Sequence, residues 1–270
     1  MKKERVDVLL VQQNLFDSRE QAKRAIMAGI IYNQKEERFD KPGEKVDTTN
    51  QFYIKGKQKQ YASRGGFKLE KALDQFGIDL QDKIVLDIGA STGGFTDLML
   101  QRGAKLSYAL DVGYNQLAWR LRNDERVVVM ERTNFRYSKP EDFQEGLPVF
   151  ASIDVSFISL KLILPVLAQI LVTNGEVVAL VKPQFEAGKE NVGKKGIVRD
   201  AQIHEQVLTD ITKFALSCGF SLLNASFSPI TGGEGNIEFL IHLKLDQGAT
   251  TNEQILAEIP AIVATAHQTL

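Results

Sequence analysis

The segment Ile84-Val-Leu-Asp-Ile-Gly-Ala-Ser-Thr-Gly-Gly-Phe-Thr-Asp97 constrains the fold more than any other part of the chain. Its opening apolar run stops at Gly89, small residues follow, and a helical pattern begins near Gly94. This order is typical of a buried parallel strand that turns directly into a helix whose N-terminus faces a ligand. Glycines at 89, 93 and 94 allow a cofactor to approach the backbone because no Cβ atom stands in the way. The segment therefore predicts an α/β sheet with a nucleoside-binding turn.

The chain after this turn alternates between strand and helix patterns. Apolar runs lie at 84–88, 105–110, 127–130, 149–153 and 177–181, with helical segments near 94–101, 115–122 and 160–171. Such alternation predicts a doubly wound parallel sheet. A helix over 201–218 is followed by two strands, 222–227 and 237–245, which have no helix between them and should pair antiparallel. A last helix, 252–270, is expected to pack on the sheet. Seven strands closed by an antiparallel last strand are the Rossmann-like arrangement of class I S-adenosylmethionine-dependent methyltransferases.

The spacing of the glycines distinguishes two cofactors. A nicotinamide site favours Gly-x-Gly-x-x-Gly, whereas this chain has Gly89-x-x-x-Gly93-Gly94. S-adenosylmethionine carries no pyrophosphate, so this looser turn suits it better. Asp111, after the second strand, is placed for the ribose hydroxyls. Asn134, after the third, is placed either near the adenine or as the cap of a turn. The other predicted cofactor-binding residues are Asp87, Gly89, Ala90, Ser91, Gly93, Gly94 and Phe95.

A basic head precedes the predicted sheet. Residues 1–71 carry a net charge of +6 and residues 72–270 carry −7, so the overall value of −1 hides an asymmetry. The asymmetry favours contact between the head and a polyanion, although a merely solvated basic surface gives the same numbers. The polar, lysine-rich stretch from Gly56 to Gln60 indicates a linker. We therefore predict a small domain over residues 1–58 and a large domain over residues 59–270.

Cap and turn residues predict a compact α+β unit within the head. Asp17 or Ser18 can cap a helix that Gly29 ends, and Arg19, Lys23 and Arg24 share an exposed side of that helix. The head resembles the alpha-L RNA-binding module, although Asn33-Gln34 replaces the usual Asn-Gly; a protein-binding head is the alternative. The matching residues are Arg5-Val-Asp7, Leu10, Leu15, Ser18-Arg19, Ala22, Ile26, Gly29 and Lys41-Pro-Gly43-Glu.

Four charged residues fall at the ends of predicted elements. Asp154 follows the fourth apolar run, Lys182 follows the fifth, Glu238 opens the last strand, and Lys68 lies on a helix over 67–76. The antiparallel last strand starts beside the carboxyl ends of the others, so we expect all four where ligands bind in such sheets. Each also fits a structural role when it is taken singly. Lys182 fits one poorly, because a charge that ends an apolar strand is costly to bury.

Together the four resemble the Lys-Asp-Lys-Glu tetrad of FtsJ-like ribose 2′-O-methyltransferases. With the head, residues 3–245 resemble the TlyA family, historically labelled haemolysins and regarded as rRNA cytidine 2′-O-methyltransferases. The supporting segments are Ser63-Arg-Gly-Gly66, Asp87 to Asp97, Glu131-Arg-Thr-Asn134, Asp154-Val-Ser-Phe-Ile-Ser159, Val181-Lys-Pro-Gln-Phe-Glu186, the loop Gly188 to Gly196, and Gly233-x-Gly-Asn-Ile-Glu238.

The resemblance implies a role for each member of the tetrad. A ribose 2′-hydroxyl attacks poorly until its proton can leave, and a neutral amine at Lys182 could take that proton. Burial and the nearby charge of Lys68 would favour that neutral amine. Asp154 would orient the amine, and Glu238 would hold Lys68. General-base help of this kind contributes on the order of 10²–10⁴-fold to a rate.

The implied partner is ribosomal RNA or a ribosomal subunit, held by two basic surfaces. The predicted RNA-binding residues are Arg5, Arg19, Lys23 and Arg24 on the head, Lys189, Lys194 and Lys195 on the loop after the fifth strand, and Arg64 near the site. Phosphate contacts of this kind make affinity fall steeply with salt concentration.

Several other functions find little support in the chain. Cys218 is the single cysteine and the three histidines are scattered, so we expect neither a disulfide nor a metal site. The longest uncharged run, Phe214 to Gly233, is too rich in serine and glycine for a membrane span, and we expect a cytoplasmic protein. A membrane-active haemolysin and a non-catalytic RNA-binding protein that also binds S-adenosylmethionine remain as alternatives. Base methylation would call for an Asn/Asp-Pro-Pro-Tyr motif, which Asp154-Val-Ser-Phe157 does not match.

Overall fold

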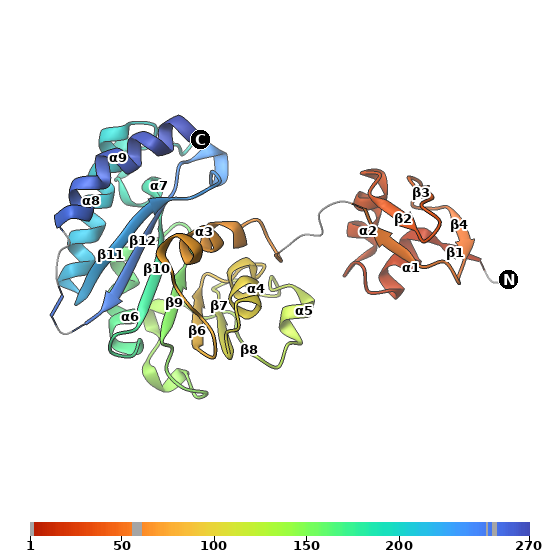
Figure 1. The fold of residues 1–270 in the computed structure, drawn as a ribbon, viewed down its shortest axis with the longest axis horizontal. Coiled ribbons are helices and arrows are strands. Elements are labelled where there is room, and N and C mark those ends of the chain that lie inside the picture. Colours follow the sequence, from red (N-terminus) through yellow and green to blue (C-terminus); the bar gives the residue numbers. More distant parts are fainter. Residues whose placement is uncertain (1–2, 56–60, 247, 250–252) are drawn as a thin grey trace. The chain divides into compact units, whose positions relative to one another are not determined.

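A computed structural model describes residues 3–55, 61–246, 248–249 and 253–270 (Figure 1). The chain divides into two compact units, Met1–Gln60 and Tyr61–Leu270, and each is considered separately. This division falls two residues after the boundary predicted at residue 58. The predicted linker, residues 56–60, lies outside the described residues.

The N-terminal unit contains two helices and two small antiparallel sheets. Strands β1 and β4 pair in one sheet, and β2 lies between β3 and β5 in the other. Ser18 caps α2, because its side chain accepts a hydrogen bond from the backbone N–H of Gln21. The elements are β1 (Lys3–Arg5), α1 (Val6–Gln12), α2 (Arg19–Met27), β2 (Ile31–Asn33), β3 (Arg38–Phe39), β4 (Lys45–Asp47) and β5 (Phe52–Ile54).

The C-terminal unit is built on a seven-stranded sheet whose order is β11-β12-β10-β9-β6-β7-β8 (Figure 1). Strand β12 runs antiparallel to both β10 and β11, and the pairs from β10 to β8 are parallel. The predicted Rossmann-like sheet with an antiparallel last strand is therefore confirmed. The strands are β6 (Ile84–Ile88), β7 (Leu106–Leu110), β8 (Val127–Met130), β9 (Phe150–Ile153), β10 (Glu176–Val181), β11 (Phe220–Phe227) and β12 (Phe239–Leu245).

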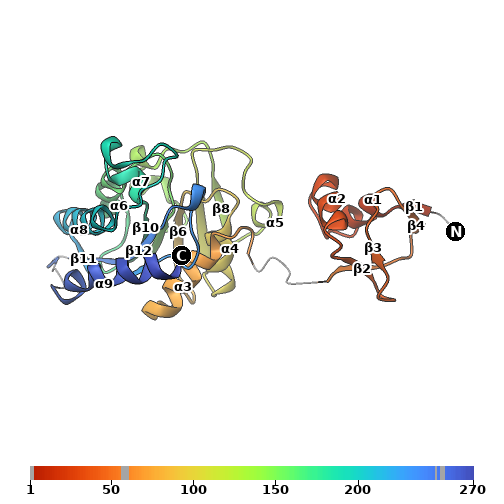
Figure 2. The same cartoon turned by 90° about the horizontal axis from the view of Figure 1, so that it is seen from above.

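Helices cover both faces of this sheet (Figure 2). Helices α3 and α4 pack on one face and α6 and α8 on the other, while α9 packs against α8 and β11, as predicted. They are α3 (Gly66–Phe76), α4 (Gly94–Gln101), α5 (Trp119–Arg122), α6 (Leu164–Ile170), α7 (Pro183–Glu186), α8 (Ala201–Ser217) and α9 (Glu253–Thr269), with 3-10 turns η1 (Phe135–Tyr137), η2 (Pro140–Asp142), η3 (Leu160–Leu162), η4 (Lys189–Asn191) and η5 (Gly233–Gly235).

Two predicted helices are shorter in the structure. The segment 115–122 reduces to α5, because Asn115 has a φ of +56° and so cannot belong to a right-handed helix. The segment 160–171 divides into η3 and α6. Pro165 lies in the first turn of α6, where its missing N–H costs nothing, but it cannot continue a helix from the preceding turn.

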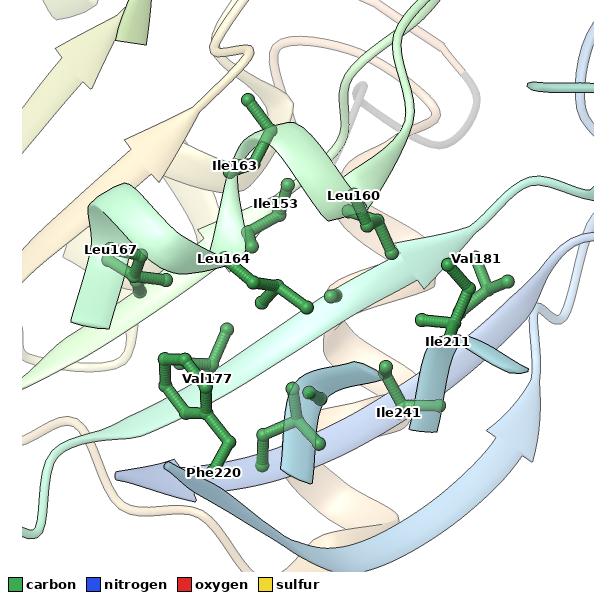
Figure 3. Close-up of a cluster of buried hydrophobic side chains, with 14 of the residues drawn as sticks. Ile153, Leu160, Ile163, Leu164, Leu167, Val177, Val181, Ile211, Phe220 and Ile241 are labelled. Carbon is green, nitrogen blue, oxygen red and sulfur yellow. The ribbon is translucent and has the colours of Figure 1, made fainter. Parts of the chain in front are cut away.

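Successive residues of a strand point to opposite faces of the sheet, so the apolar side chains form two clusters, one on each face. Val177 and Val181 of β10 face α6 and α8, whereas Val178 and Leu180 face α3 and α4. Figure 3 shows the first cluster, in which Leu164 and Leu167 of α6 lie over the sheet. Burial on both faces explains why the parallel strands are continuous apolar runs. It also leaves the carboxyl edge of the sheet as the place where polar side chains can gather.

Candidate active site

A pocket of about 440 Å³ opens at the carboxyl edge of the sheet. Its walls are the turn from β6 to α4, the segment 63–65 before α3, and the segment 230–233 before β12. Lys68 and Asp154 also line it. Ligands bind at this edge in open α/β sheets, so the pocket is the candidate site.

Glycines make the turn from β6 to α4 possible. Gly89 and Gly93 have φ values of +89° and +95°, which other L-residues adopt rarely. A Cβ atom on Gly89 would overlap the carbonyl oxygen of Asp154, and one on Gly94 would overlap Ser63 Oγ. The bare backbone thus lets β9 and the segment 63–65 close around the turn. Ala90, Ser91, Gly94 and Phe95, all predicted to bind the cofactor, line the pocket together with Gly89.

The Asp87 side chain lies in the interior of the unit, whereas it was predicted to contact the cofactor. Its side chain is fully buried, and Oδ2 accepts hydrogen bonds from the N–H (2.9 Å) and the hydroxyl (2.7 Å) of Thr96. Ser152 Oγ donates to Oδ1 at 3.3 Å. Burial raises the pKa of this carboxyl to about 7. Asp87 therefore fastens the first turn of α4 to β6 and has no surface to offer a cofactor, which corrects its predicted role as a ligand.

The segment before α3 forms another wall of the pocket, and of its residues only Arg64 was predicted to lie near the site. The backbone N–H of Ala62 donates to Asp97 Oδ2 at 2.7 Å, and Asp97 also pairs with Arg120. Asp97 belongs to α4, so this contact holds residues 63–65 against the turn. Ser63 and Gly65 thereby line the pocket beside Arg64. The available signal was the pair of small residues Gly65-Gly66 directly before a helix.

The two polar residues assigned to the nucleoside both lie at strand ends. Asp111 follows β7 and accepts hydrogen bonds from the backbone N–H groups of Ser91 (2.8 Å) and Gly113 (2.7 Å). It therefore lies against the turn from β6 to α4, and its contact with the ribose hydroxyls stays a prediction. Asn134 caps η1, since its side chain accepts a bond from the N–H of Arg136 at 3.2 Å. Its side chain thus has the capping role that was the alternative.

The four charged residues expected at this edge form one chain of ion pairs. Lys182 Nζ lies 2.5 Å from Asp154 Oδ1, and Lys68 Nζ lies 3.9 Å from Asp154 Oδ2. Lys68 also donates to Glu238 Oε2 at 2.6 Å. Both lysines are 8% exposed and Glu238 is 2% exposed, so only Asp154, with 21% of its side chain exposed, opens toward solvent. Two acids and two bases cancel, and a neutral cluster can be buried where a single charge could not.

Two further contacts fix this cluster. Ser156 Oγ accepts a hydrogen bond from Lys182 Nζ at 3.3 Å, which gives the amine a second neighbour besides Asp154. A Cβ atom on Gly232 would overlap Glu238 Oε1, so the segment before β12 can pack over the carboxylate only because residue 232 is glycine. Neither residue was singled out from the sequence, because their contacts join segments far apart in the chain.

Two aromatic rings follow the residues of this cluster: the exposed Phe157 after β9 and the partly buried Phe185 in α7. Phe157 follows Asp154 by three residues and Phe185 follows Lys182 by three, and their ring centroids are 5.0 Å apart. Phe157 is 91% exposed and has a φ of +62°, which is a strained conformation for a large side chain. With Arg136 and Leu162 the two rings line a second hollow of about 500 Å³. Phe157 was not singled out by itself from the sequence, and the exposure of its ring to solvent was not predicted.

The predicted RNA-binding residues are divided between the two units. In the N-terminal unit Arg5 and Arg19 both pair with Asp7, Lys23 pairs with Glu20 at 2.6 Å, and Arg24 is exposed. In the C-terminal unit the exposed residues Arg64, Lys189, Lys194 and Lys195 lie on loops, and Arg199 joins the last two in a third hollow of about 410 Å³. Arg199 was not predicted, although it stands four residues after Lys195 in the same polar loop.

Among the residues that the structure describes, none of the helices has the length and apolar character needed to cross a membrane. In the same ranges, His, Cys, Asp and Glu side chains form no group of three that could hold a metal ion.

Comparison with known proteins places this site in a family. The model of the FtsJ-like methyltransferases matches residues 61–245. "Putative rRNA methyltransferase YqxC" of Bacillus subtilis is 61% identical over 100% of this chain and 96% of its own length. The "16S/23S rRNA (cytidine-2'-O)-methyltransferase TlyA" of Mycobacterium tuberculosis is 42% identical over 89% of each chain.

A solved structure agrees with these relatives. "Putative hemolysin from Streptococcus thermophilus" is 60% identical, has a TM-score of 0.77, and is matched over 100% of this chain and 97% of its own. The glycine turn, the carboxylate of Asp111 against it and the pocket volume suit an adenosine-type methyl donor. This protein belongs to the FtsJ-like methyltransferase family, and S-adenosylmethionine is its methyl donor.

Proposed function

We propose that this protein methylates the 2′-hydroxyl of a cytidine ribose in ribosomal RNA. The observation that carries the proposal is the buried chain Glu238–Lys68–Asp154–Lys182 at the edge of the donor pocket. Relatives that are named for rRNA cytidine 2′-O-methylation support the choice of acceptor.

The tetrad suits a reaction in which a hydroxyl must lose its proton. When bound, S-adenosylmethionine supplies a methyl group on a positively charged sulfur. A Lys182 amine that has first released its own proton to solvent accepts the proton of the 2′-hydroxyl. As that oxygen bonds to the methyl carbon, the methyl–sulfur bond breaks and its electron pair stays on the sulfur, which becomes neutral. Asp154 lies within 2.5 Å of this amine and orients it. Lys68, held by Glu238, keeps the second oxygen of Asp154 engaged, so the carboxylate cannot turn away.

We assign the acceptor base to the aromatic pair. Phe157 and Phe185 each follow a tetrad residue by three positions, and their rings line the second hollow together with Arg136 and Leu162. A base that leaves its stack gains about 1–3 kcal/mol from an aromatic surface. An unstacked base on Phe157 would bring its ribose close to Asp154 and Lys182. The strain at Phe157 fits a residue whose position serves binding, since an exposed ring adds little to the core.

The proposal is tested by giving the protein labelled S-adenosylmethionine and separated ribosomal subunits, and mapping the label to single nucleotides. We expect label on the ribose of a cytidine, in rRNA of at least one subunit. Lys182→Met serves as the matched control, since it keeps the length and apolar stem of the side chain but cannot accept a proton. Label on a base or on ribosomal protein would refute the 2′-hydroxyl assignment, and so would equal labelling by the control.

A further inference from the structure

The N-terminal unit contains a buried carboxylate that contacts two of the predicted RNA-binding arginines. Asp7 lies in the first turn of α1 and is fully buried. Its Oδ1 accepts a hydrogen bond from Arg5 Nε at 2.8 Å and its Oδ2 from Arg5 Nη2 at 3.0 Å, which is the two-pronged geometry of the strongest guanidinium–carboxylate pairs. Arg19 Nη2 donates to the same Oδ2 at 2.9 Å.

The two arginines are only partly covered by this contact. The Arg5 side chain is 39% exposed and that of Arg19 is 52% exposed. One carboxylate between two guanidinium groups leaves a net charge of +1, and both groups keep N–H donors that Asp7 does not engage. The Arg5 contact lowers the pKa of Asp7 to about 2, so the carboxylate stays ionised at any pH where RNA is bound.

From this geometry we infer that Asp7 is a positioning residue for RNA phosphates, because it fixes Arg5 and Arg19 as one preformed two-arginine clamp. The inference rests on the proposed function for the identity of the polyanion. A free arginine side chain loses about 0.5–1.5 kcal/mol of entropy when a ligand immobilises it, and a clamp that is already fixed avoids that loss twice. Asp7 thus raises affinity for a polyanion although its own charge is negative.

Removing the negative charge of Asp7 has two opposite effects on RNA binding. Asp7→Asn removes one negative charge from a basic surface, so electrostatic attraction by itself predicts tighter RNA binding. Loss of the clamp predicts weaker binding, by roughly tenfold for two freed arginines. Asp17→Asn is the matched control, because it removes the same charge from an exposed position of the same unit.

The experiment measures filter binding of the full chain to purified rRNA, together with KM and kcat on ribosomal subunits at one salt concentration. For Asp7→Asn we expect affinity to fall and KM to rise by about tenfold, with kcat at saturating subunits unchanged. For Asp17→Asn we expect affinity equal to or above that of the unmodified protein. Affinity of Asp7→Asn at or above the unmodified value would overturn the inference.

A second pair of variants decides the question if Asp7→Asn unfolds the N-terminal unit, which hydrogen exchange over residues 3–55 would reveal. Arg19→Lys keeps the charge but loses the planar fork, whereas Arg38→Lys makes the same change at an exposed arginine of the same unit that was not assigned to RNA binding. We expect affinity to fall several-fold for Arg19→Lys and to stay unchanged for Arg38→Lys. Equal affinity of the two would contradict the clamp. An unmodified protein that binds rRNA but methylates neither subunit would refute the proposed function alone.

Discussion

Each unit contains a cluster in which acidic and basic side chains form ion pairs, but the two clusters differ in net charge and in exposure to solvent. In the C-terminal unit two lysines and two carboxylates cancel, and they lie almost fully buried at the edge of a pocket. In the N-terminal unit a single buried carboxylate contacts two arginines that remain open to solvent. The first cluster conceals its charges from water, whereas the second presents an excess of positive charge to it.

The choice of cation explains the difference. A lysine amine can lose its proton inside a protein, but an arginine guanidinium remains charged under all ordinary conditions. Lysine therefore suits a site that must accept a proton from a hydroxyl. Arginine suits a surface that must hold phosphate in a fixed geometry. We therefore predict that replacing lysine by arginine in the C-terminal cluster, or arginine by lysine in the N-terminal cluster, will impair function although the charge is conserved.

The largest expected effect concerns Lys182. We expect Lys182→Arg to lower kcat for methyl transfer by about a thousandfold, because guanidinium keeps the pairing with Asp154 but cannot accept a proton. Single-turnover transfer to rRNA measures the rate, and calorimetric binding of S-adenosylmethionine serves as the control, with affinity expected to change by less than about twofold. A variant that retains half of the normal rate would end the assignment of Lys182 as base.

The next largest effect is expected at Lys68, whose positive charge helps to keep the buried cluster neutral. Lys68→Met leaves Glu238 buried without its cation, and we expect it to lower the free energy of unfolding by about 3 kcal/mol. Adding Glu238→Leu should restore most of that stability, because no uncompensated charge then remains, while methyl transfer stays low. Chemical denaturation of the two variants measures both changes. A double variant less stable than the single one would show that the pair is not electrostatically coupled.

A smaller effect is expected at Phe157. Phe157→Gly removes the exposed ring and relieves the positive φ, so we expect unchanged or slightly higher stability. Affinity for the acceptor should still fall by about tenfold, because one stacking surface is lost. KM for ribosomal subunits and the melting temperature together measure this. Leu162→Ala is the control, since it alters the same hollow without removing an aromatic surface. Equal KM for the two variants would argue against stacking on Phe157.

The smallest effect is expected at Asp87, a third buried carboxylate, and concerns the pH dependence of stability. Asp87 contacts Thr96 and Ser152 instead of cations, and its pKa is raised to about 7, whereas that of Asp7 is lowered to about 2. A raised pKa means that the stability contributed by protonated Asp87 is lost as the pH rises toward 7. We expect Asp87→Asn to gain stability relative to the unmodified protein by up to about 1.4 kcal/mol per pH unit between pH 5 and 7.

Denaturation curves at pH 5, 6 and 7 measure that trend, and cofactor affinity is measured alongside. Because Asn can still accept the Thr96 bonds, we expect S-adenosylmethionine to bind Asp87→Asn as well as the unmodified protein. A constant difference in stability across this range would show that Asp87 does not titrate. A large loss of cofactor affinity would restore its predicted role as a ligand.

Local sequence patterns predicted most of the large unit. The strand β6 and the helix α4 have the bounds that the apolar run and the glycines indicated, and the antiparallel last strand followed from the missing helix before it. The meeting of Asp154, Lys182 and Glu238 at one edge was predictable because strand direction decides which strand ends lie together. Lys68 lies on α3, so its place depended on how that helix packs. The errors came from backbone details, such as the positive φ of Asn115 and the proline that starts α6.

The sequence by itself thus determined the order and direction of the strands, the glycine turn and the identity of the charged residues that the topology gathers. Only the tertiary structure decided which way individual side chains point. It turned Asp87 inward to Thr96, exposed Phe157, brought Ser63 against Gly94, and placed Asp7 beneath Arg5 and Arg19. Periodicity and strand direction are properties of short segments, whereas these contacts depend on distances between segments that no local pattern records.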